Sequence, residues 1–325
     1  MGPPDVSVIM PVYNGSRYLD QAIRSALAQT HERFELIIVN DCSTDDSDSI
    51  IRSHLADPRI VYLCNDANAG VAASRNHALR HARGRYICFH DQDDLWVPEK
   101  LALQLDVIEA HPDAGLLHAA YARIDPSGSV FKEDLPQDYG SRDPSAAATV
   151  MQADVFSEIF ISNDIQPLTT MIRRDILDEV GHFNPDLPGV DDYDLWLRIA
   201  YRYPVAHLQV LVGFWRQHER QQSRQGYRML LAKLNAIDSF LVQHPEARSR
   251  VPAAAFRQRM YTMNASAANH HLYDTRDFRT AATHFRKALR YRPLSADALV
   301  KLAYCSLPAP LMSIVRRLKN TLTRS

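Results

Sequence analysis

The sequence predicts an α/β fold, in which a mostly parallel sheet is flanked by helices and followed by a small all-α region. Three observations support this prediction. Short apolar runs alternate with helix-period stretches between Val6 and Phe89. Polar residues gather directly after these runs, where parallel sheets bind their ligands. From Tyr227 onwards the pattern is helical, so we expect one domain at residues 1–225 and a helical region at 226–325.

Each expected strand of the first half is a short apolar run bounded by polar residues. The stretch from Arg17 to Gln29 places its apolar residues on one face of a helix. Ser47 or Asp46 is expected to cap the next helix. The expected strands are Val6–Met10 (ended by Pro11), Phe34–Val39, Ile60–Leu63 and Tyr86–Phe89, and the helices between them are Arg17–Gln29, a short helix through Ile50 and Leu55, and Val71–Ala82.

The second half of this domain is less regular. The segment from Asp125 to about Val150 is rich in Pro, Asp, Ser and Gly, and we expect a mobile loop or insertion there, near an acceptor. The other expected elements are a helix at Lys100–Ala110, a strand at Gly115–Tyr121, an apolar stretch at Leu168–Ile172 and a short helix at Arg174–Val180.

Composition excludes several classes of protein. The net charge of −1 argues against a nucleic-acid-binding partner. The four cysteines lie far apart without CxxC spacing, which fits a reducing compartment and gives no zinc or disulfide signal. Neither a signal peptide nor a run long enough to span a bilayer is evident. We therefore expect a cytoplasmic protein.

The chain is most informative between Arg85 and Trp96, where a buried apolar run ends in Asp91, Asp93 and Asp94. Carboxylates crowded at a strand end repel one another, so a cation is the natural compensation. Oxygen ligands favour Mg²⁺ or Mn²⁺, which also bind substrate phosphates. An acidic turn would leave the same pattern, so the DxD spacing alone does not decide between the two.

Other strand ends carry further candidates. Asp41 can accept hydrogen bonds from a base or ribose, or can serve as a turn residue. Asn68 and Gly70 begin the next helix, where free backbone N–H groups can meet a phosphate. Arg75 can pair with that phosphate, although an arginine on a helix is more often solvated. PVYNGS follows the first strand without GxGxxG spacing, which excludes a Rossmann dinucleotide site.

Four segments resemble family 2 glycosyltransferases of the Rossmann-like GT-A fold: VSVIMPVYNGSRYLDQAIRSALAQT, FELIIVNDCSTDDS, NAGVAASRNHAL and GRYICFHDQDDLWVPEKL. The resemblance runs in order from about Val6 to Ser223. It implies a nucleotide-sugar donor, a divalent metal and inversion at the anomeric carbon. One departure is Cys42, where many relatives have Gly.

The resemblance also implies roles for residues at the donor site. Asp41 would bind the base or ribose. Asp93 would be the principal ligand of Mg²⁺ or Mn²⁺, and Asp91 would hold the ribose or a metal-bound water. The residues that would surround the base are Pro11, Tyr13 and Asn14.

Inverting transfer needs a base on the side of the sugar opposite the leaving diphosphate. Asp191 and Asp192 precede an amphipathic helix in a segment that also looks like the family, LTTMIRRDILDEVGHFNPDLPGVDDYDLWLRIAYRYP. The family usually has Glu-Asp here and its second residue matches the base. The resemblance therefore implies Asp192 as base, with Asp191 as the alternative. Two acidic residues stabilising a helix N-terminus would give the same pattern.

FWRQHERQQSR closes the catalytic region and resembles the family's strand-then-RxH segment. His218 is expected to be the second protein ligand of the metal or to touch the diphosphate. A lone histidine in a polar loop is otherwise often simply exposed. Arg216 is expected to neutralise charge on the departing phosphate.

The C-terminal region predicts helices only. Met229–Leu241 is expected to be one helix, and Ala267–Pro293 resembles a tetratricopeptide helix pair. Because repeat arrays need about three units, we expect this single pair to pack against the catalytic domain. The tail LMSIVRRLKNTLTRS predicts either a basic amphipathic helix on an anionic membrane surface or an ordinary surface helix.

We expect a metal-dependent enzyme that moves a sugar from a nucleotide sugar, most simply a UDP-sugar, to a glycan or lipid-linked acceptor in cell-surface polysaccharide synthesis. A sugar nucleotidyltransferase is one alternative, but it would usually have a Gly-rich basic loop after the first strand. A catalytically inactive nucleotide-binding scaffold is the other, and the intact Asp91, Asp93 and Asp192 argue against it.

Overall fold

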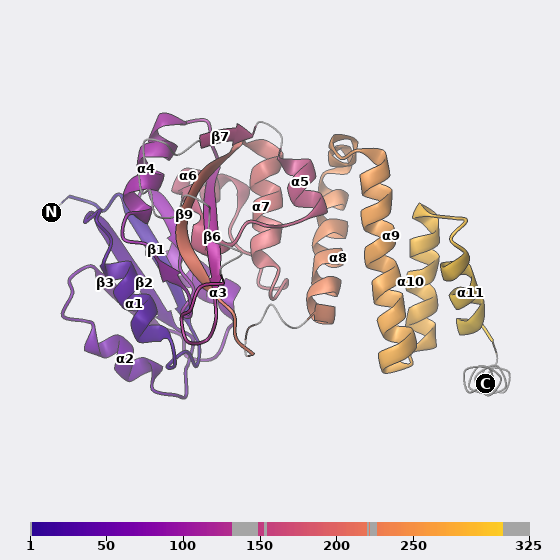
Figure 1. The fold of residues 1–325 in the computed structure, drawn as a ribbon, viewed down its shortest axis with the longest axis horizontal. Helices are drawn as coiled ribbons and strands as arrows, with labels where there is room; N and C mark the ends of the chain where they lie inside the picture. The colour runs from indigo at the N-terminus through magenta and orange to yellow at the C-terminus, as the bar shows by residue number, and fades with distance from the viewer. Residues whose placement is uncertain (1, 132–148, 153–154, 220, 222–225, 308–325) are drawn as a thin grey trace. The chain divides into compact units, whose positions relative to one another are not determined.

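The computed structural model describes residues 2–131, 149–152, 155–219, 221 and 226–307 (Figure 1). The chain divides into two units, Met1–Arg224 and Gln225–Ser325. The first is an α/β unit and the second is helical.

The first unit is built on one sheet with the strand order β3-β2-β1-β4-β8-β6-β9-β5, in which β7 also pairs with β9. Its N-terminal half is parallel: β1 (Val6–Val12) pairs with β2 (Phe34–Asn40) and β4 (Tyr86–Phe89), and β2 pairs with β3 (Ile60–Cys64). The remaining strands are β5 (Leu95–Trp96), β6 (Leu116–Ile124), β7 (Thr149–Gln152), β8 (Met171–Arg173) and β9 (Val205–Arg216).

The other half of the sheet is mixed, because β6 and β9 pair in parallel while β5, β7 and β8 pair antiparallel to their neighbours. The predicted α/β fold with a mostly parallel sheet flanked by helices is confirmed. The helices of this unit are α1 (Leu19–Leu27), α2 (Ser47–Ser53), α3 (Val71–Leu79), α4 (Lys100–Ala110), α5 (Phe156–Ile161), α6 (Arg174–Val180) and α7 (Asp191–Arg202).

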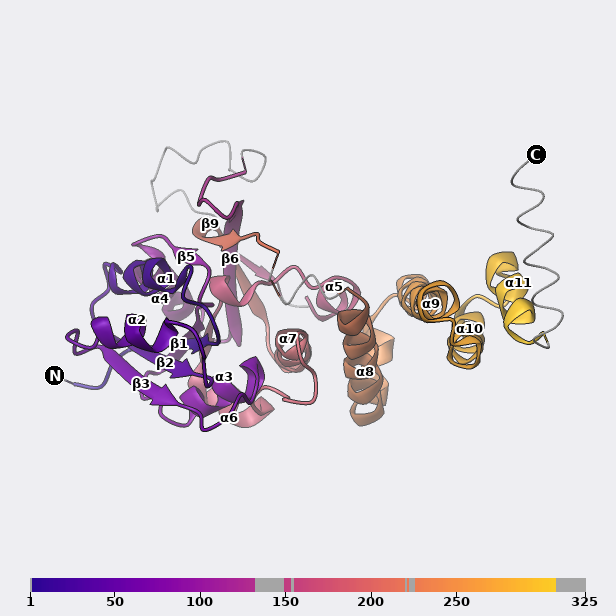
Figure 2. The same ribbon diagram turned by 90° about the horizontal axis from the view of Figure 1, so that it is seen from below.

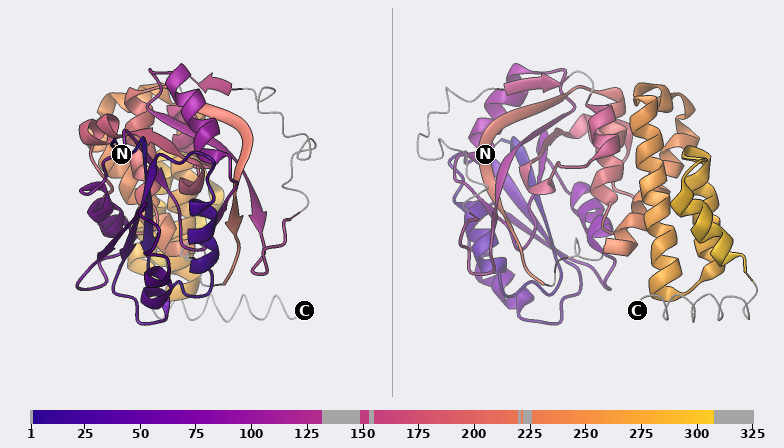
Figure 3. Two further views of the ribbon diagram at one scale, coloured as in Figure 1. Left: turned by 90° about the vertical axis from the view of Figure 1, so that its left-hand side faces the viewer. Right: turned by 45° about the vertical axis from the view of Figure 1, so that its right-hand side comes forward.

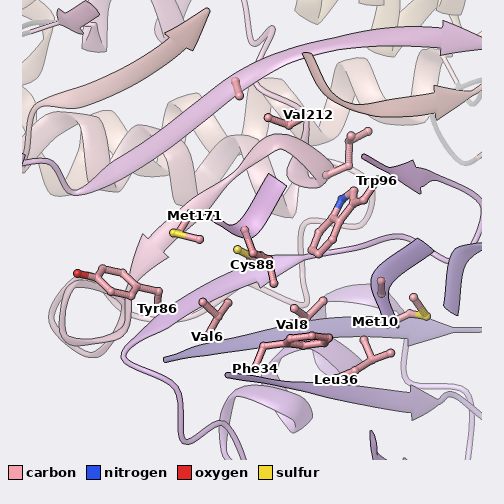
Figure 4. Packing of buried hydrophobic residues seen from close by; sticks show 14 of the residues in the cluster. Val6, Val8, Met10, Phe34, Leu36, Tyr86, Cys88, Trp96, Met171 and Val212 are labelled. Carbon is pink, nitrogen blue, oxygen red and sulfur yellow. The ribbon is translucent and has the colours of Figure 1, made fainter. Parts of the chain in front are cut away.

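Helices cover both faces of the sheet. α1 and α4 lie on one face, and α3, α6 and α7 lie on the other (Figure 2). Val8, Met10 and Leu36 belong to the apolar cluster between the sheet and the face covered by α1 and α4 (Figure 4). On the opposite face, the centroid of the Phe89 ring lies 5.0 Å from that of Phe183. Burial on both faces explains why these strands read as continuous apolar runs rather than alternating ones.

Several boundaries differ from expectation. β1 does not end at Pro11, since Pro11 pairs with Val39 and the strand continues to Val12. Asp46, one of the two expected candidates, is the N-cap residue of α2, but it forms no side-chain cap hydrogen bond there. A turn follows β6, with a bridge between Ile124 and Val130. The rest of the expected insertion, residues 132–148, lies outside the described part of the chain.

The second unit contains α8 (Gly226–Gln243), α9 (Ala253–His270), α10 (Phe278–Tyr291) and α11 (Ala296–Cys305). α9 and α10 run side by side (Figure 3). A π-helical turn and a left-handed residue, Arg276 with φ 58°, separate them. Asp277 then caps α10 by accepting from the backbone N–H of Thr280 at 3.0 Å. The helical region is confirmed, whereas its tetratricopeptide likeness stays a prediction.

The basic C-terminal tail lies outside the described residues, which end at Leu307. Within the described part of the chain, no helix combines the length and the apolar character needed to cross a bilayer.

Candidate active site

Three loops meet at the carboxyl ends of β1, β2 and β4. These strands are parallel neighbours, so their ends lie at one edge of the sheet. The loops begin at Tyr13, Asp41 and His90. Hydrogen bonds between residues far apart in the sequence join them into one polar surface.

The loop after β1 is held by side chains from the other two loops. Asn14 has a left-handed backbone, with φ 48°, and its Oδ1 accepts from the Thr44 N–H at 2.8 Å. Four successive N–H groups donate outward: Tyr13 to Gln92 Oε1 at 2.9 Å, Asn14 to Ser43 Oγ at 3.1 Å, Gly15 to Ser47 Oγ at 3.0 Å and Ser16 to Asp45 Oδ2 at 3.0 Å. None of these four donors is left to cradle a phosphate.

Asp41 organises the start of α3. Its buried carboxylate accepts from the Asn65 amide at 2.7 Å, the Ala69 N–H at 2.9 Å and the Gly70 N–H at 2.8 Å. The expectation of a free N–H at Gly70 is therefore wrong, because Asp41 already occupies that donor. Asn68 is exposed beside it. Contact of Asp41, Asn68 or Gly70 with a donor stays a prediction.

Arg75 joins two carboxylates rather than lying on a solvated face. Its side chain is 4% exposed, and it donates from Nη2 to Asp91 Oδ1 at 2.8 Å and from Nη1 to Asp191 Oδ2 at 3.0 Å. Burial alone would lower the pKa of Arg75, but the charges of Asp91, Asp191 and Asp192 raise it above its usual value. Its buried Nε has no protein partner. The link ties the loop after β4 to the first turn of α7.

Asp93 and His218 lie together, as the sequence predicts. Asp93 Oδ2 is 2.7 Å from His218 Nε2, and the Tyr18 ring centroid lies 5.2 Å from that of His218. Both side chains remain partly exposed, at 21% for Asp93 and 14% for His218. The described residues contain no group of three or more His, Cys, Asp or Glu side chains arranged to hold a metal. A carboxylate–imidazole pair nevertheless fits Mg²⁺ or Mn²⁺, because such ions are often held by one or two protein ligands plus substrate phosphates.

Asp94 follows Asp93 and is the third aspartate of this loop, after Asp91 and Asp93. It is buried and accepts from the Arg216 N–H at 2.9 Å. Burial raises the pKa of the Asp94 carboxyl, and the negative charges of Asp93 and Asp91 raise it further. The crowding of carboxyl groups that the sequence predicts is therefore present, and a bound cation would favour their charged forms.

Arg216 differs from expectation. Its guanidinium is buried instead of open to a phosphate, donating from Nε to the Asp93 carbonyl at 2.8 Å and from Nη2 to Gln21 Oε1 at 2.9 Å. It also lies 4.5 Å from the centroid of the Tyr18 ring. Burial lowers the pKa of Arg216. These contacts fix the backbone that carries Asp93, so the structure gives Arg216 a positioning role, and a direct phosphate contact stays a prediction.

Asp191 and Asp192 open α7 in different surroundings. Asp191 is 2% exposed and ion-paired to Arg75, and burial raises the pKa of its carboxyl while the Arg75 charge opposes the rise. Asp192 is half-buried, and its Oδ1 accepts from the Tyr193 N–H at 2.6 Å. Solvent therefore reaches Asp192 but hardly reaches Asp191.

Gln92 was missed by sequence reasoning. It stands between Asp91 and Asp93, and it bonds both the N–H and the C=O of Tyr13, 79 residues away. A polar residue between two aspartates gives no signal of such a distant partner. The φ of 61° at Cys42 was also unforeseen, although the family's Gly at that position pointed towards a left-handed backbone.

The family model "Glycosyl transferase family 2" matches residues 7–181. An uncharacterized glycosyltransferase of Rickettsia felis is 28% identical over 222 residues, covering 68% of this chain and 35% of the relative. The putative teichuronic acid biosynthesis glycosyltransferase TuaG of Bacillus subtilis is 44% identical over 104 residues, covering 32% of this chain and 41% of TuaG. The chain thus spans about a third of the length of the relatives from Rickettsia felis and Rickettsia conorii.

Two solved structures share the fold. TarS 1-349 of S. aureus, in complex with UDP, aligns with a TM-score of 0.60 and 19% identity, over 92% of this chain and 88% of the other. The mannosyltransferase PcManGT of Pyrobaculum calidifontis, in complex with GDP-Man and Mn²⁺, aligns with a TM-score of 0.58 and 20% identity, over 96% and 83%. The predicted GT-A architecture is confirmed by this likeness. Since the family model covers more than half of its length, the chain belongs to glycosyl transferase family 2.

Proposed function

We propose that the chain transfers a sugar, with inversion, from a nucleoside-diphosphate sugar to a hydroxyl of a glycan or lipid-linked acceptor. One observation carries this proposal. The Asp93–His218 pair lies at the edge of the sheet where the loops after β1, β2 and β4 meet, and Arg75 links that edge to the aspartates of α7. The proposed donor, metal and base positions would thus be connected by one network of polar side chains.

Asp93 and His218 are the residues that would hold Mg²⁺ or Mn²⁺, with Asp91 placed for the ribose or a metal-bound water. When bound, the cation would offset the charge that develops on the leaving diphosphate. Arg216 supports this arrangement, because its Nε donates a hydrogen bond to the Asp93 carbonyl oxygen.

The nucleoside would lie against the exposed side of the loop after β1. Tyr13 and Asn14 are exposed there, whereas their N–H groups are engaged by other loops. Pro11 is buried within β1, two residues before Tyr13. A UDP-sugar is the donor we propose, since TarS has been solved with UDP, with GDP-mannose as the alternative that PcManGT suggests.

Asp192 is the proposed general base. A base must reach the acceptor hydroxyl and must change its protonation state during turnover. The half-buried position of Asp192 at the first turn of α7 supports this role, because an acceptor could approach its carboxylate. Asp191 is less suited, because it is buried and ion-paired to Arg75.

The sugar nucleotidyltransferase alternative loses support at the loop after β1. A phosphate-binding loop needs free backbone N–H groups. Here the four N–H groups from Tyr13 to Ser16 all donate to protein side chains. The scaffold alternative makes the opposite prediction about turnover, since it binds nucleotide without consuming it.

The proposed acceptor class is argued from a relative rather than from the geometry of the site. TuaG is named for teichuronic acid biosynthesis, which supports a cell-surface polymer as the product to which this chain contributes. Work on such a polymer fits a cytoplasmic enzyme whose basic tail touches the inner face of the membrane. A lipid-linked acceptor would then be presented at that surface.

A thermal-shift panel tests the proposal. UDP, GDP, CMP, dTDP and their common sugar conjugates are compared with and without Mn²⁺, on the wild type and on Asp93→Ala. We expect one nucleotide to raise the melting temperature only with metal, and the variant to lose this response while remaining folded. A folded wild type that responds to no nucleotide under either condition would contradict the proposal.

A further inference from the structure

Gln92 connects two loops of the proposed site: the loop after β4, which carries the proposed metal ligand Asp93, and the loop after β1, which would bind the nucleoside. It lies between Asp91 and Asp93, and its side chain reaches across to the backbone of Tyr13. Its Oε1 accepts from the Tyr13 N–H at 2.9 Å, and its Nε2 donates to the Tyr13 carbonyl at 3.1 Å. One carboxamide thus satisfies both backbone groups of Tyr13, in the way a neighbouring strand would.

Gly15 makes this contact possible. A Cβ at Gly15 would lie 2.2 Å from Gln92 Oε1 and 2.5 Å from its Cδ, so any side chain there would displace the carboxamide. The Gly15 backbone does not have a positive φ, unlike that of Gly70. Space for Gln92, rather than backbone conformation, therefore accounts for the glycine.

The other backbone N–H groups of the loop after β1 bind a different part of the chain. The Asn14 and Ser16 N–H groups donate to the loop after β2, and the Gly15 N–H donates to Ser47 at the start of α2. Within the described residues of this loop, the hydrogen bonds that reach the segment carrying Asp91 and Asp93 are those of Gln92. The carboxamide of Gln92 is thus a direct hydrogen-bonded connection between Tyr13 and the loop that carries Asp93, beside the ring contact of Tyr18 with His218.

We propose that Gln92 is a positioning residue that sets the spacing between the nucleoside-binding loop and the metal ligands. A nucleoside diphosphate must contact Tyr13 with its base and the Asp93-bound cation with its phosphates at the same time. A fixed spacing makes the two contacts mutually reinforcing, so metal strengthens nucleotide binding and nucleotide strengthens metal binding by the same factor. This inference rests on the proposed function, because it presumes that the ligand is a nucleoside diphosphate.

The test measures that coupling directly. The dissociation constant of UDP (or of the diphosphate selected by the panel above) is determined by titration calorimetry with Mn²⁺ and with EDTA, and the ratio of the two is the coupling factor. The proteins are the full-length wild type, Gln92→Ala, Gly15→Ala and the double variant. Ser43→Ala is the matched control, because it removes the bond to the Asn14 N–H without touching the loop after β4.

We expect Gln92→Ala and Gly15→Ala to lower the coupling factor by roughly tenfold each, a size typical of a lost coupling between sites. The double variant should be no worse than either single one, because both changes remove the same contact. Ser43→Ala should keep the coupling, and melting temperatures should show that all five proteins are folded. A general loosening of the fold would weaken binding with and without metal alike and leave the ratio unchanged.

Two results would overturn the inference, and they are distinguishable. If the wild type shows metal-enhanced binding and the folded Gln92→Ala and Gly15→Ala variants retain the whole ratio, Gln92 does not set the spacing and the proposed function stands. If the wild type binds no nucleoside diphosphate at all, the proposed function fails and the inference fails with it.

Discussion

Two adjacent aspartates at the start of α7 show how environment separates residues of the same chemistry. Asp191 points inward and is ion-paired to Arg75 at 3.0 Å, while its neighbour Asp192 remains half-buried. A charge that is buried and paired contributes to stability only while its partner is present. A charge that reaches solvent can exchange a proton with an acceptor hydroxyl.

Asn substitutions should therefore separate the two roles. Asp192→Asn should lower kcat by about 10²–10⁴-fold, the usual contribution of a general base, with donor affinity and melting temperature little changed. Asp191→Asn should instead destabilise the fold by about 3 kcal/mol, because it leaves the buried Arg75 short of a charged partner. Initial-rate kinetics and urea unfolding of both variants measure the two effects, and the opposite pattern would exchange the assignments.

Cys42 stores backbone strain beside the site. Its φ of 61° is in the left-handed region, where a side chain costs about 1–2 kcal/mol relative to glycine. Cys42→Gly should therefore stabilise the protein by about 1 kcal/mol after the entropy of the more flexible unfolded chain is subtracted. Cys64→Gly is the control, since Cys64 is also exposed but ends the extended strand β3, and it should be destabilising. If urea unfolding showed that both substitutions change the free energy of unfolding in the same direction, the strain argument would be refuted.

At the scale of elements, the strands of the parallel half could be predicted because burial on both faces leaves continuous apolar runs. β9 could only be predicted in part. It is 12 residues long, and its pairing with β6 contains register shifts that leave Gln209 exposed in the middle of the strand. Its sequence therefore follows neither the continuous nor the alternating pattern.

The site was predictable to a similar degree and for a related reason. The motifs identify Asp93 and His218, which lie 125 residues apart and pair in the structure. They do not show that Arg75 and Arg216 are buried, because burial of an arginine depends on acceptors contributed by distant segments. They also cannot show that Asp41 takes up the Gly70 N–H, because local sequence permits either role for an aspartate at a strand end.

The β6–β9 pair also predicts how stability depends on pH. His118 and His207 face each other with ring centroids 4.3 Å apart. Burial and the neighbouring His207 lower the pKa of His118 from 6.5 to about 3, and burial lowers the pKa of His207 as well. The folded protein therefore binds fewer protons at these sites than the unfolded chain, and the free energy of unfolding should fall as the pH drops from 6.5 towards 3.

His118→Phe should reduce this slope by up to about 1.4 kcal/mol per pH unit, the value for one proton. Urea unfolding at several pH values between 4 and 7, spaced about one unit apart, gives the slopes. Identical slopes for the wild type and His118→Phe would show that this pair is not the source of the pH dependence.

At the scale of the whole molecule, the proposed chemistry belongs to the first unit. Every proposed site residue lies before Arg224, and each unit has its own cluster of buried apolar side chains. A chain ending at residue 224 should therefore bind the nucleoside diphosphate and Mn²⁺ within about twofold of the full chain. Calorimetric titration of the two proteins checks this. A folded truncation that binds neither would place part of the site in the second unit.

The central claim is that Asp93 and His218 hold a divalent cation against the donor diphosphate. The most direct measurement is a crystal structure of the full chain with Mn²⁺ and the nucleoside diphosphate that stabilises it, with manganese located by its anomalous scattering. We predict one peak about 2.0–2.4 Å from an Asp93 carboxylate oxygen and from diphosphate oxygens, as expected for hard-cation coordination. A nucleotide bound at the strand ends with manganese away from Asp93, or with no manganese beside its phosphates, would contradict the account.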